Sequence, residues 1–293
     1  MPTILQASDT HLSRTHPLFQ FNFEVLLREI ERLQPDLVVY TGDLSLNGPD
    51  NPDDVAYASE QLARTPVPYL ALPGNHDIGL VPYGGHSTQL ITPQRRAAYL
   101  EAFGYDKFSC VLGGWRLIGL NSQLMGSGLP AENEQFEWLG EQLAASALPA
   151  AVFMHYPAFL HQPQDTDVGL HALGTDARER LLSVFAQAGT VRLVGTGHLH
   201  QARSAVHEGI RYEWAPSSAF TIPGESLNHL GGQQVTGVLM HELGEDSVAS
   251  RIVEPALMMQ MDLRNWSKTT PHGYYQVVGQ PWPVGANGET VPA

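Results

Sequence analysis

The N-terminal part of the chain alternates between short apolar runs and stretches in which apolar residues recur at helical spacing. The apolar runs cover residues 3–7, 37–40 and 67–72, and the helical patterns cover residues 23–33 and 53–63. A short apolar run is typical of a strand that is buried on both faces, as in a parallel sheet covered by helices. The β-α-β-α-β order therefore predicts an α/β fold with a largely parallel sheet.

Later in the chain the pattern changes to paired strands. Residues 150–154 and 191–194 are still single apolar runs, but the other runs come in pairs joined by turn-forming residues: 108–112 with 115–120, 204–206 with 210–214, and 237–243 with 248–253. Such pairs predict β-hairpins. Beyond residue 254 the apolar residues no longer recur at helix or strand spacing. We therefore expect one domain at residues 1–254 and an irregular C-terminal extension at residues 255–293, which packs on the body or on a partner subunit.

Polar side chains follow the ends of the five single apolar runs. In chain order they are Asp9 and His11, then Asp43, then Asn75 and His76, then His155, and finally His198 and His200. The carboxyl ends of parallel strands meet at one edge of a sheet, where functional groups collect. Imidazole, carboxylate and amide oxygen are ligands of first-row metals, and a shared carboxylate can hold two ions for in-line attack at phosphorus. The pattern therefore predicts a dinuclear metal site.

The composition of the chain excludes several classes of binding partner. The formal net charge of −14 provides no basic surface for a phosphate backbone, so we expect no nucleic acid polymer as partner. Cys110 is the only cysteine, which excludes an intrachain disulfide. No apolar stretch has the length of a signal segment or of a membrane span. We expect a soluble, cytoplasmic protein with no membrane partner.

The motifs resemble a known signature. The series Asp9-x-His11, Gly42-Asp43, Gly74-Asn75-His76-Asp77, His155 and Gly197-His198-x-His200 is similar to that of the calcineurin-like metallophosphoesterase superfamily. Their local sequence is closest to the bacterial class III cyclic nucleotide phosphodiesterase branch. Tyr156 departs from that branch, which often carries a second histidine there. The resemblance implies a four-layer α/β/β/α sandwich.

The resemblance also implies roles for single residues. One metal ion would be held by Asp9, His11, Asp43 and His200, and the other by Asp43, Asn75, His155 and His198. Asp43 would bridge two divalent or trivalent ions, whose identity among Mn, Fe, Zn and Co is open. His76 would lie at the scissile phosphate, either stabilising charge or protonating the leaving alkoxide. Asp77 would either orient the His76 ring or cap the turn.

The expected activity is hydrolysis of a small phosphodiester by in-line attack of a metal-bridging hydroxide. A 3′,5′-cyclic nucleotide such as cAMP is the expected substrate type. Phosphomonoesterase and glycerophosphodiesterase activities on the same site are alternatives, and so is a catalytically inactive interaction scaffold. A scaffold would have lost metal ligands, whereas every ligand position is filled here. We expect a homodimer, and we expect substrate contacts from three loop histidines: His86, His161 and His171.

Overall fold

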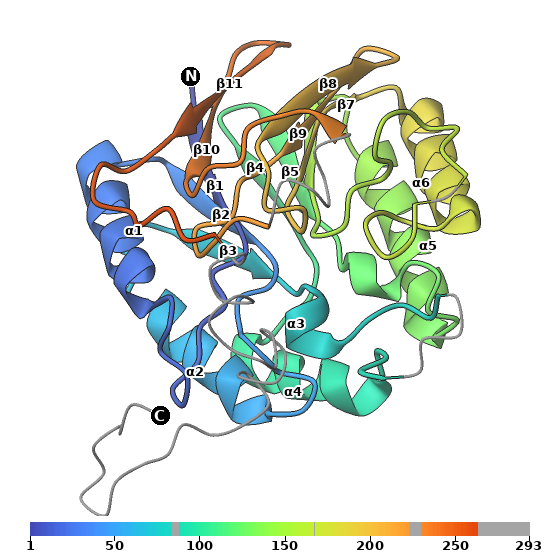
Figure 1. Cartoon of the computed structure of the whole chain (residues 1–293). Helices are drawn as coiled ribbons and strands as arrows, with labels where there is room; N and C mark the ends of the chain where they lie inside the picture. Colours follow the sequence, from blue (N-terminus) through green and yellow to red (C-terminus); the bar gives the residue numbers. More distant parts are fainter. Residues whose placement is uncertain (84–87, 167, 223–229, 263–293) are drawn as a thin grey trace, which may run out of the picture.

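The structure is a computed structural model that describes residues 1–83, 88–166, 168–222 and 230–262. Helices and strands alternate along most of the chain (Figure 1). Their order is β1 (Thr3–Ala7), α1 (Gln20–Leu33), β2 (Leu37–Thr41), α2 (Pro52–Leu62), β3 (Tyr69–Leu72), α3 (Asn75–Ile78), α4 (Pro93–Phe103), β4 (Phe108–Leu112), β5 (Trp115–Gly119), α5 (Pro130–Ala144), β6 (Ala150–Phe153), α6 (Thr175–Ala188), β7 (Val191–Thr196), β8 (Arg203–His207), β9 (Ile210–Trp214), β10 (Val238–Leu243) and β11 (Val248–Val253).

Local sequence explains where several helices begin and end. α4 starts after Thr92, whose hydroxyl accepts from the Arg95 N–H at 3.2 Å, and Pro93 suits the first helical turn because it lacks a donor that would go unused. The same helix ends at Gly104, which adopts a left-handed backbone with φ of 80°. α6 ends in the same way at Gly189. The boundaries of these helices are therefore determined largely by the residues at their ends.

The strands form two sheets among the described residues. The first has the order β11-β10-β1-β2-β3, and the second has the order β4-β5-β6-β7-β9-β8. β1, β2 and β3 run parallel, and so do β5, β6, β7 and β9. The predicted hairpins are confirmed as antiparallel pairs at the edges of the sheets. The parallel centre of each sheet therefore brings the strand ends together at one edge.

Alternating side chains divide the molecule into layers. Ile4 and Val39 pack with Phe153 and Leu193 in a core between the two sheets. The neighbouring Leu5 and Val38 belong instead to the core under α1, α2 and α4. On the other side, α5 and α6 cover the second sheet (Figure 1). The predicted four-layer α/β/β/α sandwich is thus confirmed.

The first part of the C-terminal extension packs on the body. The Asn22 side chain of α1 donates to the Met259 carbonyl at 3.0 Å and accepts from the Met259 N–H at 2.8 Å. Met258 is buried beside it. Residues 263–293 lie outside the described residues, so packing of the whole extension stays a prediction. None of the described helices combines the length and hydropathy that crossing a bilayer requires.

Candidate metal centre

The residues predicted as metal ligands converge on one edge of the sandwich. Asp9 and His11 follow β1 and Asp43 follows β2, while His155 follows β6 and the pair His198 and His200 follows β7. Asn75 opens α3, so the motif begins a short helix rather than lying in a plain turn. Both sheets thus contribute ligands. Three groups have ligand atoms within 4.8 Å of one another: Asp9, His11 and His200; His11, Asp43 and His76; and Asp43, His155 and His198.

Asp43 lies at the middle of this arrangement. Its Oδ2 atom is 3.2 Å from His155 Nε2 and 4.0 Å from His11 Nε2. Asn75 Oδ1 lies 3.2 Å from the same His155 nitrogen. On the other side, Asp9 Oδ1 is 3.2 Å from His200 Nε2. One carboxylate therefore faces imidazoles of both predicted ion sites, as a bridging ligand must.

Backbone carbonyls determine which imidazole nitrogens carry the protons. Three of the rings donate to a carbonyl oxygen at 2.7 Å: His155 Nδ1 to Thr41, His198 Nε2 to Leu170, and His200 Nδ1 to Phe220. A neutral ring with one nitrogen protonated presents a lone pair on the other. For His155 the remaining nitrogen, Nε2, faces the Asp43 and Asn75 oxygens at 3.2 Å, where it can donate a proton to them or, once deprotonated, share a cation with them. The donor set therefore fits metal ions.

Backbone N–H groups hold the two carboxylates in place. The His76 N–H donates to Asp43 Oδ1 at 2.7 Å, and the His198 N–H donates to Asp9 Oδ2 at 3.1 Å. In each case the second oxygen is left to face the imidazoles. Asp9 Oδ1 is buried and receives no hydrogen bond from any of the described residues. A buried carboxylate oxygen without a donor is costly unless a cation satisfies it.

The ligand residues adopt strained backbone conformations. Positive φ values occur at Asp9 (55°), His11 (46°), Asp43 (50°), His198 (70°) and His200 (52°). For a residue with a side chain this region costs on the order of 1 kcal/mol, and such strain collects at functional sites. The surrounding hydrogen bonds and packing must hold these loops in place. The strain is thus an independent sign of function.

Two glycines of the motifs are required by close packing. A Cβ atom at Gly74 would collide with Asp43 Oδ1 and with the Asp43 backbone nitrogen. A Cβ atom at Gly197 would collide with Ser8 Oγ and lie 2.8 Å from Asp9 Oδ2. Because both glycines lack a side chain, the Asp43 and Asp9 carboxylates can occupy their positions in the site.

Electrostatics couple the same groups. Burial disfavours charge on Asp9, but the adjacent His200 and His155 outweigh burial and lower the pKa of the Asp9 carboxyl to about 2. Burial likewise opposes charge on His155, yet Asp43 and Asp9 raise the pKa of this imidazole to about 9. Burial and the charge of His155 lower the pKa of His198 to about 3. The carboxylates are therefore ionised and His198 is neutral, as ligands need to be, whereas His155 must release its Nε2 proton when it binds a metal ion.

Asp77 does not orient the His76 ring. Its carboxylate accepts from the N–H groups of Gly74 at 2.8 Å, Leu44 at 3.1 Å and Ser45 at 2.8 Å, and from the Ser45 hydroxyl at 2.7 Å. The His76 Nδ1 atom instead donates to the Leu46 carbonyl at 2.7 Å. Of the two roles considered for Asp77, a bond to the His76 ring is therefore not seen, and a catalytic role for Asp77 stays a prediction. The alternative, a carboxylate that caps the turn, agrees with the structure.

His76 lies next to the ligand cluster. Its ring is 4.7 Å from the His11 ring, nearly perpendicular to it, and the residue is only half-buried. Because Nδ1 donates to a carbonyl, Nε2 is the nitrogen available to a ligand or substrate. His76 also has a ring nitrogen within 4.8 Å of ligand atoms of His11 and Asp43. The geometry therefore suits a role at the phosphate and leaves room for one as a ligand.

The predicted substrate contacts differ in position. The His171 ring lies 6.5 Å from the His198 ring, so it borders the cluster. His161 is exposed, and its backbone N–H donates to Asp165 Oδ2 at 2.7 Å. His86 lies outside the described residues. Of the three, His171 is the one that the structure places beside a predicted ligand.

Other residues of the site carry no sequence motif. The Phe220 ring lies 4.2 Å from the His200 ring and 4.9 Å from the His11 ring, forming an apolar wall. The Tyr156 ring lies 4.2 Å from the His198 ring. The sequence marked Tyr156 only as a departure from the branch pattern directly after His155. No signal in the sequence points to Phe220, which comes from a loop after β9.

A model of the calcineurin-like phosphoesterases matches residues 2–202, which include every predicted ligand. The chain belongs to this family. Members of the family are metal-dependent phosphoric ester hydrolases with a dinuclear metal centre, and the clusters around Asp43 are where the ligands of such a centre belong.

Individual relatives share only a minority of their residues with this chain. The serine/threonine-protein phosphatase CPPED1 of Bos taurus is 30% identical over 189 residues, which are 60% of this chain and 57% of that protein. A probable cyclic nucleotide phosphodiesterase of a Psychrobacter species is 27% identical over 207 residues, 68% of this chain and 57% of that protein. The chain thus matches little more than half the length of these relatives.

A dimetal phosphatase from Danio rerio has the same fold as this calcineurin-like phosphoesterase. The two superpose with a TM-score of 0.57 at 15% identity, covering 86% of this chain and 97% of the other. The likeness extends over both sheets, because the matched share of the chain is too large for either sheet alone. At this identity it supports the fold.

Proposed function

We propose that this protein hydrolyses a small phosphodiester, with 3′,5′-cyclic nucleotides such as cAMP as its substrate class. The observation that carries the proposal is Asp43 Oδ2, which lies between imidazoles of two ligand clusters at the strand ends. A relative named as a probable cyclic nucleotide phosphodiesterase supports the choice of substrate. The local sequence around Asp9, Asp43 and His155 favours the same branch.

Two ligand sets would hold the ions. Asp9, His11 and His200 would form one set with Asp43, and Asn75, His155 and His198 would form the other with the same carboxylate. When bound, two such ions lower the pKa of coordinated water and neutralise charge on the phosphoryl oxygens. The protein positions the ligands through the carbonyls of Thr41, Leu170 and Phe220.

His76 would act on the leaving group. Its Nδ1 proton is held by the Leu46 carbonyl, so a proton on Nε2 makes the ring an imidazolium. Transfer of that Nε2 proton to the leaving alkoxide would leave a neutral ring whose Nδ1 proton is still bound by the Leu46 carbonyl. The half-exposed position of His76 permits contact with a phosphate above the ligands. These features suit a general acid.

The proposal is tested with protein reconstituted with Mn²⁺ and a substrate panel. The panel compares bis-p-nitrophenyl phosphate, p-nitrophenyl phosphate, cAMP and glycerophosphodiesters, with kcat/KM as the readout. We expect diesters to be preferred and cAMP to be hydrolysed. A strong preference for the monoester would overturn the diesterase assignment and favour a phosphomonoesterase, the class suggested by the relative named serine/threonine-protein phosphatase.

A non-catalytic scaffold is the alternative of a different class. The described residues retain a side chain of the right chemistry at each ligand position, and the loops that bear them are strained, which a scaffold would not require. Elemental analysis of the purified protein separates the two proposals. Absence of bound metal together with no hydrolysis after Mn²⁺ addition would favour the scaffold.

A further inference from the structure

A cavity of about 270 Å³ lies against the predicted ligand His198. Two of its wall residues contact this histidine directly: the Tyr156 ring lies 4.2 Å from the His198 ring, and the Leu170 carbonyl accepts from His198 Nε2 at 2.7 Å. His198 also has a ring nitrogen within 4.8 Å of ligand atoms of Asp43 and His155. The cavity and the ligand cluster therefore share one wall.

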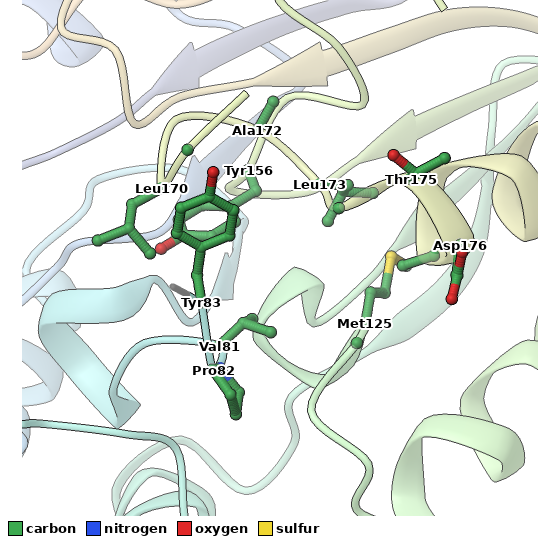
Figure 2. Close-up of a pocket in the computed structure, with 14 residues that line it drawn as sticks. Val81, Pro82, Tyr83, Met125, Tyr156, Leu170, Ala172, Leu173, Thr175 and Asp176 are labelled. Atoms are coloured by element: carbon green, nitrogen blue, oxygen red, sulfur yellow. The ribbon is translucent and has the colours of Figure 1, made fainter. Parts of the chain in front are cut away.

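The chemistry of the cavity changes along its length. Figure 2 shows Tyr83, Tyr156 and Leu170 at one end, which is the end that contacts His198. The apolar Leu173 and Met125 follow. At the far end lie Thr175 and Asp176 of the first turn of α6. A group entering from the phosphate would thus meet aromatic rings first, then apolar side chains, and finally a carboxylate.

This order selects among the organic groups that a phosphodiester can carry. The described lining contains no lysine, arginine or histidine, so a second anionic group would find no cation there. Such a group would also meet the Asp176 carboxylate, and repulsion between like charges disfavours it. Aromatic rings favour flat apolar groups or organic cations. A carboxylate favours a hydrogen-bond donor or a positive charge at the far end.

We infer that this cavity binds the organic substituent of the phosphodiester, as an apolar group that bears a hydrogen-bond donor or a positive charge at its far end. Asp176 selects that far end, and Tyr83 and Tyr156 hold the body of the group. The inference rests on the proposed function, because it assigns the phosphate to the adjacent metal centre. Two sources supply this chemistry: a nucleobase with an exocyclic amine, and an alcohol that bears a quaternary ammonium.

Two matched substrate pairs test the inference. The first pair is 3′,5′-cAMP and purine riboside 3′,5′-cyclic monophosphate, which lacks the exocyclic amine and has no other donor on that edge of the base. The second pair is p-nitrophenyl phosphocholine and p-nitrophenyl 3,3-dimethylbutyl phosphate, which has the same shape without the charge. We expect the wild type to prefer the first member of at least one pair in kcat/KM. Asp176→Asn should reduce that preference about tenfold, the loss typical of one hydrogen bond to a charged group.

Asp53→Asn is the matched control. Asp53 is also an exposed carboxylate in the first turn of a helix, α2, so this change removes the same charge away from the cavity. It should leave both preferences unchanged. The pair whose preference falls in Asp176→Asn identifies the source of the group. If the wild type shows no preference in either pair, or if Asp176→Asn keeps the preferences intact, the cavity does not select the substituent and the inference is wrong.

A binding measurement separates this result from failure of the proposed function. Calorimetry on the metal-loaded protein compares the dissociation constants of 5′-AMP and purine riboside 5′-monophosphate, and of phosphocholine and its uncharged isostere, without turnover. A preference for the donor-bearing or charged ligand that Asp176→Asn abolishes supports the cavity even if no diester is hydrolysed. Hydrolysis of bis-p-nitrophenyl phosphate without any binding preference would instead keep the function and overturn the cavity.

Discussion

Asp43 is the residue on which both ligand clusters depend. Its Oδ2 atom faces His155 and His11, and its Oδ1 atom is held by the His76 N–H. Asp43→Asn should therefore lower bound metal and turnover more than His11→Ala or His155→Ala, each of which affects one cluster. Elemental analysis and kcat at several Mn²⁺ concentrations measure this, and excess Mn²⁺ should partly restore only the histidine variants. Turnover near that of the wild type in Asp43→Asn without added metal would refute a bridging role.

His76 makes a separable contribution. His76→Ala should keep the metal content but lower turnover of a cyclic nucleotide by about 10²- to 10⁴-fold, because a ribose alkoxide needs a proton to leave. The loss should be smaller for bis-p-nitrophenyl phosphate, whose phenolate leaves without protonation. Equal losses on both substrates would indicate charge stabilisation instead. Loss of bound metal would make His76 a ligand, a reading that its distance from Asp43 permits.

At the scale of elements, the entry into α3 sets the position of Asp43. Because a Cβ atom at Gly74 would collide with the Asp43 carboxylate and backbone, Gly74→Ala should weaken metal binding by about 10- to 100-fold, the range seen when groups that support a ligand are changed. Metal titration of the metal-free variant measures the loss.

Gly140→Ala provides the matched control for that change. A Cβ atom at Gly140 meets nothing within 4 Å, and the residue lies inside α5. Alanine there should leave metal affinity unchanged and raise the free energy of unfolding by about 0.5–1 kcal/mol, since glycine is the poorer helix former. Unchanged metal affinity in Gly74→Ala would show that the loop accommodates a side chain.

The elements that could be predicted from sequence are those with a local pattern. The single strands were recognisable from apolar runs, and the ligands could be named because polar residues follow those runs. The sheet that each hairpin joins was not predictable: β10 pairs with β1, whereas β9 pairs with β7. Such pairings depend on long-range packing of both cores. The hairpin pattern alone is equally compatible with either sheet.

Inside the site, the contacts that backbone groups make with the functional side chains could not be predicted from sequence. The carbonyls of Thr41, Leu170 and Phe220 determine the protonation of three imidazoles, yet every residue carries a carbonyl, so no residue type marks them. Asp77 illustrates the same limit, since its position beside His76 suggested a bond to the ring. In the structure its carboxylate turns instead to the N–H groups of Leu44 and Ser45.

At the scale of the whole molecule, a buried polar network joins the two sheets beneath the metal centre. His241 of β10 donates from Nε2 to Gln6 Oε1 at 2.9 Å and faces the Ser250 hydroxyl with Nδ1 at 2.8 Å. The Gln6 amide in turn donates to Thr41 Oγ1 at 3.2 Å and to the Thr196 carbonyl at 3.0 Å. Thr41 ends β2 and Thr196 ends β7, so the network ties together the strand ends that bear ligands of both clusters.

This network makes stability sensitive to acid. Burial, with a smaller effect of Arg211, lowers the pKa of His241 from its ordinary 6.5 to about 3. Between these values the unfolded chain binds a proton at this residue that the folded protein does not. The stability contributed by neutral His241 is therefore complete above the unfolded pKa and is lost as pH falls below it. The slope should be at most about 1.4 kcal/mol per pH unit between about pH 6 and pH 4.

His241→Asn tests this effect, because asparagine keeps a donor for Gln6 but does not titrate. The variant is expected to be less stable than the wild type at pH 7.5, since the smaller side chain packs less well. Its free energy of unfolding, measured by urea titration of metal-free protein from pH 7.5 to pH 4.5, should fall less steeply than that of the wild type. Other histidines titrate in both proteins, so the difference between the two slopes isolates residue 241. Parallel slopes would mean that His241 is already accessible to protons in the folded state, and that the network does not hold it neutral.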